Sequence, residues 1–251
     1  MPIPGWEVSV AKSLWGKVGP WLWSRLRSGL VGRRFKQVFG RGVEGPGFTL
    51  VYAELALAPA LAAVSRFPYV KPGGNPQAGF SISRPVSLCE LRAAGYLASA
   101  IGDGVGRTPA LRSDADVRAL FDLDFVSFGG PESNFKSRDC QVNPGNRLAR
   151  FDQQVTQFLD LNTKNPLAVC SDPNFDYGLI LKVRPSQFPN RAWLMCAGFG
   201  EWGTSGAAWY LANRWEDIRK EAKGRPFALV LRISPPQDQS AEPIVLKVGR
   251  E

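Results

Sequence analysis

The sequence predicts an α/β fold in which an open, mixed β-sheet is flanked by helices. Short apolar runs, many rich in β-branched and aromatic residues, are typical of strands, and they alternate with segments of helical composition. Glycine-rich turns follow two of these runs directly, as they do where a strand leads into a helix in an open sheet. The 251 residues include 26 Gly and 20 Pro, which favours a loop-rich α/β protein over a helical bundle.

The predicted elements follow from these patterns in chain order. Strands are expected in residues 107–113, 124–128, 167–170, 177–184, 191–198, 226–234 and 243–248, and at the start of 48–57. Helices are expected in residues 87–102, 113–123 and 204–222. Residues 135–166 are polar and irregular, with one short strand expected near 148–152 or 154–161. A turn signal separates 177–184 from 191–198, so these two strands are expected to form a hairpin.

Two of the predicted helices begin with capping residues. Ser87 is followed three residues later by Glu90, which is the spacing of a capping box. Ser113 is a second N-cap candidate, with Asp114 and Asp116 in the first turn, where the helix dipole favours acidic side chains.

The chain divides by charge into a basic extension, residues 1–45, and a single α/β domain, residues 46–251. The extension has eight Lys and Arg against two Glu, so it carries +6 of the formal net charge of +9. Two helices are expected there, at 7–18 and 20–31, with Pro20 in the first turn of the second. The extension also holds four of the eight tryptophans, which are Trp6, Trp15, Trp21 and Trp23.

Three interpretations of the basic helices stay open. They could pack on the protein's own core, dock on a membrane surface or a protein partner through residues 1–41, or contact a nucleic-acid backbone. Lysines and arginines interrupt the apolar stretches, which fits neither a secretory signal nor a membrane-spanning helix.

Histidine is absent from the chain, and this limits the chemistry available. Ser-His-Asp and Cys-His catalysis and His-ligated metal sites are excluded, and no metal site is expected. The four cysteines are widely spaced, without a C-x-x-C pair, which favours a reducing compartment. We therefore expect a cytoplasmic protein, peripheral at the membrane if the basic helices dock there.

A G-x-G-x-x-G pattern follows the predicted strand 191–198. Such glycines let the backbone approach a ligand, and the N–H groups and dipole at the start of the next helix favour an anion. The ligand-binding residues predicted in this loop are Gly198, Gly200, Gly203, Thr204 and Ser205. The alternative is a purely structural bend between a strand and a helix.

Two features argue against a dinucleotide dehydrogenase. Its fingerprint requires an acidic residue about 20 residues further on, at the end of the next strand. The next strand here ends at Ser234, and no acidic residue follows before Asp238. The loop also contains the bulky side chains of Phe199 and Trp202, unlike a bare phosphate cradle.

A second glycine loop, GGPESN, follows the predicted strand 124–128. Gly129 and Gly130 end the strand, while Ser133 and Asn134 offer hydrogen bonds to a ligand. The same residues also suit an ordinary strand-to-helix turn in which Ser133 or Asn134 caps a helix.

Each glycine loop places a glutamate just past a strand end. These residues, Glu201 and Glu132, are the catalytic candidates. If the two strands are parallel neighbours, both carboxylates could face one crevice, where glutamate can bind ribose hydroxyls or stabilise an oxocarbenium-like centre. The alternative is two solvated loop glutamates.

At the level of the fold, DFVSFGGPESN and AWLMCAGFGEWGTSG resemble the strand and glycine-loop elements of Rossmann-like nucleotide-binding proteins. They also resemble the nucleotide- and nucleoside-processing domains of prokaryotic signalling and defence proteins, in which a loop glutamate serves at the ribose. The resemblance covers residues 85–235 and implies a nucleotide ligand, NAD or another.

The leading functional hypothesis is binding of a nucleotide-like, phosphate-bearing small molecule, with ribose-centred hydrolysis or transfer as the enzymatic form. The first alternative is a non-enzymatic interaction or scaffold domain that docks through its basic N-terminal helices. Nucleic-acid binding by the basic end is a further alternative, and it predicts an affinity that falls steeply with salt.

Overall fold

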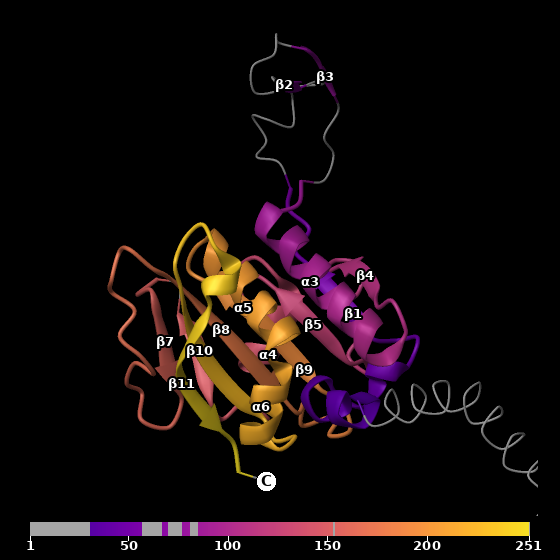
Figure 1. Ribbon diagram of the computed structural model, residues 1–251, viewed down its shortest axis with the longest axis vertical. Helices are drawn as coiled ribbons and strands as arrows, with labels where there is room; N and C mark the ends of the chain where they lie inside the picture. The colour runs from indigo at the N-terminus through magenta and orange to yellow at the C-terminus, as the bar shows by residue number, and fades with distance from the viewer. Residues whose placement is uncertain (1–30, 57–66, 70–76, 81–84, 153, 251) are drawn as a thin grey trace, which may run out of the picture.

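A computed structural model describes residues 31–56, 67–69, 77–80, 85–152 and 154–250 of the chain (Figure 1). The helices predicted at 7–18 and 20–31 lie outside these residues, apart from residue 31. Residues 31–39 are helical and lead into a 3-10 turn, η1 (Arg41–Glu44). Within the described part of the chain, no helix is long and apolar enough to cross a membrane.

The centre of the molecule is a seven-stranded mixed sheet with the order β11-β10-β8-β9-β5-β1-β4. β4, β1, β5 and β9 run parallel, whereas β8, β10 and β11 continue the sheet through antiparallel pairs. The strands are β1 (Thr49–Tyr52), β4 (Ala110–Ser113), β5 (Phe125–Phe128), β8 (Asp176–Val183), β9 (Trp193–Gly198), β10 (Phe227–Ile233) and β11 (Glu242–Val248). This confirms the predicted open, mixed sheet of a Rossmann-like α/β fold and the hairpin between β8 and β9.

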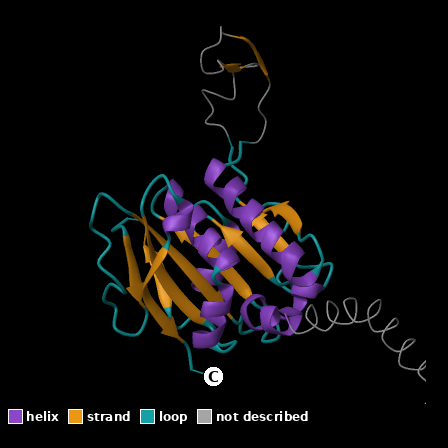
Figure 2. Cartoon of the chain, in the orientation of Figure 1, coloured by secondary structure: helices purple, strands orange, loops and turns teal. Residues whose placement is uncertain are grey.

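Apolar side chains alternate along the strands and form one core on each face of the sheet, because successive residues of a strand point to opposite faces. In β8, Ile180 enters one core, whereas Leu179 and Leu181 enter the other. Helices cover the first face: residues 31–39, α3 (Leu88–Val105), α5 (Glu201–Asn213) and α6 (Trp215–Ala222) (Figure 2). The second face packs against α4 (Phe135–Val142) and a hairpin of β6 (Ala149–Asp152) and β7 (Gln157–Asp160). A further hairpin joins β2 (Phe67–Tyr69) and β3 (Gln77–Phe80).

Part of the segment that we assigned to the basic extension belongs to the core. Phe35, Val38, Phe39 and Val43 are each at most 1% exposed and pack in the first core. The α/β unit therefore includes residues 31–45.

Two of the predicted elements are wrong. Residues 113–123 form turns and no helix, because the Asp114 carboxylate accepts hydrogen bonds from the N–H groups of Glu54 and Phe135 instead of starting a helix. Residues 167–170 form no strand, and Val169 is 79% exposed. Among the described residues, the run meets β7 where the N–H of Leu167 donates to the carbonyl of Phe158, beside an isolated bridge between Leu159 and Pro166.

Other predicted boundaries are corrected by the structure. The helix expected at 204–222 begins earlier, at Glu201, and breaks at Arg214 into α5 and α6. The region 135–166, expected to be irregular with one short strand, contains α4 and two strands, β6 and β7. Helix α4 is strongly polar, with Cys140 as its only fully buried apolar side chain, so its sequence lacks the apolar stripe of an ordinary surface helix.

The chain reverses direction across the sheet at β1 and β5. From β1 the chain passes through α3 to β4 on one side, whereas from β5 it passes through α4 and then to β9 on the other side. In open α/β sheets, ligands bind at such a switch point, in the crevice outside the carboxyl ends of the strands. The loops after β1 and β5 therefore mark the place to look for a site.

Candidate functional site

Glu90 lies at the switch point between β1 and β5. It is in the first turn of α3 and only 4% exposed. Its Oε2 accepts a hydrogen bond of 2.7 Å from the N–H of Ala53, the residue that follows β1. Its Oε1 lies against the turn after β5, since a Cβ atom added to Gly129 would come within 2.7 Å of it. The carboxyl group therefore bridges the ends of β1 and β5.

The capping box predicted from Ser87 and Glu90 is not formed. Ser87 is the N-cap residue of α3, but its side chain does not cap the helix. Its hydroxyl lies 3.0 Å from the Sγ atom of Cys89 instead, while Glu90 turns toward Ala53. Glu90, predicted as part of a helix cap, is thus a buried residue of the candidate site.

Burial raises the pKa of Glu90 from 4.5 to about 7. Loss of hydration disfavours the carboxylate, and the negative charge of nearby Asp114 adds to this, whereas the hydrogen bond from Ala53 opposes it. A carboxyl group with this pKa is present in both protonation states near neutral pH. That is the property required of a general acid–base.

The GGPESN loop lies against the carboxyl group of Glu90. Gly129 has φ +85°, a backbone conformation that L side chains rarely adopt, and its N–H donates to the carbonyl of Cys196 in β9. Ser133 stabilises the turn through a hydrogen bond from its hydroxyl to the carbonyl of Gly130. These predicted binding residues border the site that contains Glu90.

Asn134 holds the ends of β1 and β5 together. Its amide nitrogen donates to the carbonyls of Val51 and Phe128, and its amide oxygen accepts from the N–H groups of Lys136 and Ser137 at the start of α4. The side chain therefore acts as the helix cap that was the alternative interpretation of this loop, and it also links the ends of β1 and β5.

The G-x-G-x-x-G loop is organised by Asp176, the first residue of β8. Its carboxylate accepts hydrogen bonds from the N–H groups of Gly200, at 3.0 Å, and Gly203, at 2.8 Å. A carboxylate at this position also complements the positive end of the helix dipole of α5. The protein thus supplies its own anion where the sequence predicted a phosphate.

The glycines of this loop also allow close packing. A Cβ atom at Gly198 would meet the backbone of Gly203 at 2.3 Å, and one at Gly203 would meet the carbonyl of Tyr177 at 2.2 Å. Thr204 and Ser205 lie inside α5 and are buried, rather than at its exposed start.

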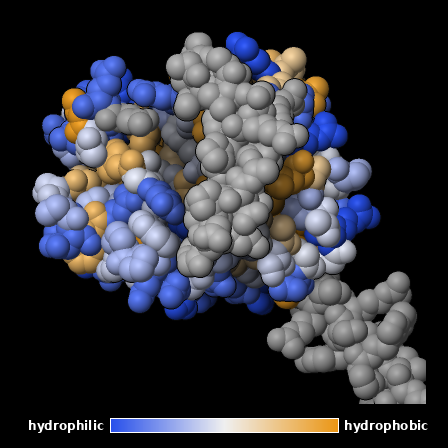
Figure 3. Space-filling view, turned by 90° about the horizontal axis from the view of Figure 1, so that it is seen from above, coloured by the Kyte–Doolittle hydropathy of each residue, from blue (hydrophilic) through white to orange (hydrophobic). Residues whose placement is uncertain are grey.

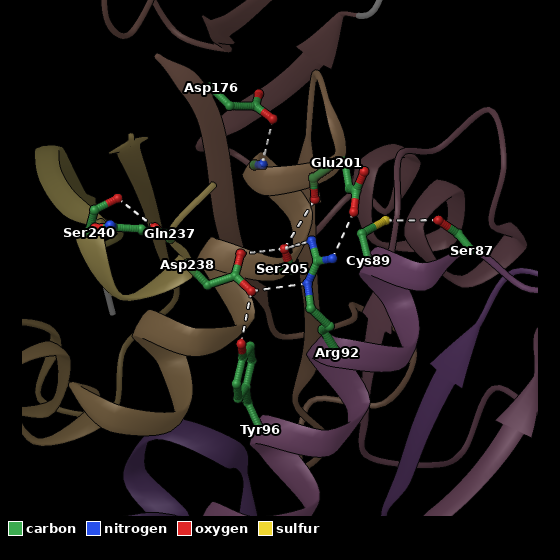
Figure 4. Close-up of polar contacts among 11 residues, drawn as sticks. Ser87, Cys89, Arg92, Tyr96, Asp176, Glu201, Ser205, Gln237, Asp238 and Ser240 are labelled. Carbon is green, nitrogen blue, oxygen red and sulfur yellow. Dashed lines mark hydrogen bonds and ion pairs between the residues drawn. The ribbon is translucent and has the colours of Figure 1, made fainter. Parts of the chain in front are cut away.

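Arg92 joins α3 to α5 and to η2 (Asp238–Ser240) through a polar cluster (Figure 4). Its guanidinium group lies 2.7 Å from Glu201 and 3.1 Å from Asp238, donates to the hydroxyl of Ser205, and stacks over the ring of Trp202. Asp238 is the first acidic residue after β10, and it also accepts hydrogen bonds from Ser205 and from Tyr96. The carboxylate of Asp238 is therefore held within this network of α3, α5 and η2.

The two predicted catalytic glutamates occupy different surroundings. The strands that precede them, β5 and β9, are parallel neighbours, as the hypothesis of a shared crevice required. Glu201 is 48% exposed and paired with Arg92. Glu132 is exposed, and the described residues provide it with no hydrogen bond or ion pair.

Three helices begin at the carboxyl edge of the parallel strands, and they differ in their caps. Asn134 caps α4 and Asp176 accepts the N–H groups at the start of α5, whereas no described side chain caps α3. Cys89, in the first turn of α3, has a raised pKa because burial disfavours its thiolate. The start of α3 therefore combines uncapped N–H groups with a thiol and the carboxyl group of Glu90.

The surface around the start of α3 is partly apolar. Figure 3 looks down on this edge, where apolar patches lie among hydrophilic residues. The exposed apolar residues of the segments that lead into and out of residues 57–84 are Leu55, Val86, Leu88 and Leu91.

Sequence reasoning missed four residues of this edge: Glu90 as a site residue, Arg92, Asp114 and Asp176. Glu90 carried a signal, but the same spacing also describes a capping box. The contacts that bring the other three to this edge span 21 to 146 residues of the chain, so no local pattern indicated them. No group of three or more Cys, Asp or Glu among the described residues could hold a metal ion.

Comparisons with known proteins add no family to this description. No protein-family model matches the chain. No curated protein and no solved structure matches it either.

Proposed function

We propose that the chain binds a nucleotide-like, phosphate-bearing ligand at the carboxyl ends of β1 and β5, and that Glu90 acts there in hydrolysis or transfer at the ribose. The observation that carries this proposal is the buried carboxyl group of Glu90, with a pKa of about 7, at the switch point of an open α/β sheet. The proposal keeps the ligand class expected from the sequence and moves the leading catalytic candidate from Glu201 to Glu90.

The start of α3 supports binding of the phosphate. An 18-residue helix places a partial positive charge and several free N–H groups at its N-terminus. The N-termini of α4 and α5 already have side-chain partners in Asn134 and Asp176. A ligand phosphate would therefore be attracted to α3, with Arg92 one turn further along the same helix.

Glu90 is suited to cleavage at the anomeric carbon of a ribose. In hydrolysis, its carboxylate takes a proton from a water molecule as the water oxygen bonds to that carbon. The bond to the base breaks, and the base leaves with the bonding electron pair and gains a proton, which Glu90 or solvent can supply. In transfer, an acceptor hydroxyl replaces the water. Cys89 is a poorer candidate for covalent chemistry, because burial raises the pKa of its thiol.

Nucleotide titrations of the full chain test the proposal. NAD, ADP-ribose, ATP and nucleoside monophosphates are each added, thermal stability is measured, and release of the free base is followed by chromatography. We expect at least one of them to raise the melting temperature and to lose its base. Glu90→Gln keeps the size of the side chain and should bind the ligand but release no base.

Glu132→Gln is the matched control, because it makes the same change in an exposed glutamate after β5. It should leave binding and base release as in the wild type. The binding proposal would be contradicted if none of the nucleotides changes the melting temperature. Base release that survives Glu90→Gln would contradict the catalytic role of Glu90.

A further inference from the structure

A strongly basic hollow lies at the opposite end of the sheet from Glu90. It has a volume of about 420 Å³ and is bordered by the end of the helix at 31–39, the loop between β8 and β9, and the turn after α6. None of its lining residues is acidic. The basic residues that line it are Lys36, Arg41, Lys182, Arg184, Arg191 and Lys223.

Carboxylates neutralise only two of these six cations. Lys36 pairs with Glu44 at 2.6 Å. Arg191 pairs with Asp122 at 2.7 Å and with Asp124 at 3.2 Å. The other four cations make no ion pair with any carboxylate of the described chain.

Lys182 forms the floor of the hollow. It is 3% exposed, and its ammonium group donates to the carbonyls of Gln37, at 2.5 Å, and Gly224, at 3.2 Å. Because an ammonium group has three donors, one N–H remains beyond these two contacts. Burial and the nearby charge of Arg184 lower the pKa of Lys182 to about 7, although Asp124 opposes this shift.

Only some of the basic side chains of the hollow are explained by contacts with the carbonyl groups at helix ends. The carbonyls that Lys182 binds lie at the end of the helix at 31–39 and just after α6, where cations are favourable. Arg184 also donates to the carbonyl of Gly224. Arg41 and Lys223 have no such role, since the described residues offer them neither a hydrogen bond nor an ion pair through their side chains.

We propose that this basic hollow is a second binding site, which takes the phosphate groups of a small polyphosphate anion. Arg41, Arg184 and Lys223 lack carboxylate partners and repel one another, and the protonated form of Lys182 adds to this repulsion. A bound anion would relieve the repulsion while accepting charge-assisted hydrogen bonds. The hollow is of the size of small-molecule pockets. Its donors converge from separate segments on a buried floor, which suits a compact anion better than an extended nucleic-acid backbone.

The test uses the full chain and tripolyphosphate, which has neither ribose nor base. Isothermal titration at low and at physiological salt measures affinity. Arg41→Gln and Lys223→Gln each remove one exposed charge at the rim, so folding should be unaffected. We expect each substitution to weaken tripolyphosphate binding about tenfold, the effect of losing one hydrogen bond to a charged group.

Lys220→Gln is the matched control. It removes an exposed lysine one turn before Lys223, outside the hollow. Its affinity for tripolyphosphate should equal that of the wild type. The proposal is overturned if tripolyphosphate does not bind, or if Lys220→Gln weakens binding as much as the rim variants do, because the effect would then be one of net charge.

A single-stranded oligonucleotide provides the competing outcome. If it binds and the rim variants weaken it, while tripolyphosphate does not bind, the hollow is part of a nucleic-acid interface and the proposal is wrong. The test is also separate from that of Glu90. Base release should persist in the rim variants. A negative result at the basic hollow would therefore not contradict the proposal for Glu90, and the reverse also holds.

Discussion

The carboxyl group of Glu90 accepts a 2.7 Å hydrogen bond from the N–H of Ala53, and so ties the first turn of α3 to the end of β1. The two residues are 37 positions apart. Their contact places a buried acid at the carboxyl ends of β1 and β5, where the chain reverses across the sheet. The acid–base chemistry proposed for this protein depends on that placement.

The buried state of Glu90 predicts a specific pH dependence of stability. Between pH 4.5 and about 7 the folded state holds a proton on Glu90 that the unfolded chain has released. Raising the pH through this window therefore favours unfolding, and the contribution of Glu90 to the free energy of unfolding falls by about 3 kcal/mol. Below pH 4.5 and above about pH 7, the contribution of Glu90 to the free energy of unfolding no longer changes with pH.

Urea unfolding at several pH values from 4 to 8 measures this effect as the difference between the wild type and Glu90→Gln. Glutamine cannot titrate, so the variant should lose the fall in stability that the wild type shows. Glu132→Gln should follow the wild type. Identical pH profiles for the wild type and Glu90→Gln would contradict the raised pKa.

Gly129→Ala is expected to disturb the contact between Glu90 and the turn after β5. The new Cβ atom would lie 2.7 Å from Oε1 of Glu90 and 3.0 Å from Oγ of Ser133, at a backbone with φ +85°. Steric and backbone strain should lower the free energy of unfolding by about 1 to 3 kcal/mol, measured by chemical denaturation. Gly102→Ala in α3 is the control, since nothing lies within 4 Å of its Cβ position. It should be neutral or slightly stabilising.

Asp176→Ala tests whether the G-x-G-x-x-G loop is a structural turn. The change removes the carboxylate that accepts from the N–H groups of Gly200 and Gly203. We expect a loss of about 1 to 2 kcal/mol in the free energy of unfolding, as for other helix caps. Asp103→Ala, on the exposed side of α3, should not lower it. A stability of Asp176→Ala equal to that of the wild type would mean that the cap is dispensable.

The two carboxylates that contact Arg92 should differ in their effect on stability. Glu201 is 48% exposed, so Glu201→Gln should cost less than about 1 kcal/mol, as for surface ion pairs. Asp238 is 2% exposed and holds Arg92, Ser205 and Tyr96 together. Asp238→Asn should therefore cost about 2 to 3 kcal/mol, because Arg92 loses the buried one of its two carboxylate partners and Ser205 and Tyr96 lose a charged acceptor. Thermal or chemical unfolding of both variants provides the comparison, and equal costs would contradict it.

The sequence by itself determined the strand pattern and the glycine turns. Strands β5, β8, β9 and β10 and the helix α3 lie close to their predicted positions, because apolar periodicity and turn residues are local signals. Helix α4 could not be found in this way, since it is short, polar and held by the cap of Asn134. The helix predicted at 113–123 failed because Asp114 binds distant backbone groups instead of its own turn.

Only the tertiary structure decided which residues make the site. The sequence located both glycine loops at the correct edge of the sheet, but the partners of their polar groups depend on strand order. Asp176 reaches Gly200 from 24 residues away, and Arg92 reaches Asp238 from 146. Glu90 has the same spacing from Ser87 as any capping-box glutamate, and only the adjacency of β1 and β5 buries it. Hydrogen bonding and desolvation depend on neighbours in space, which no local pattern specifies.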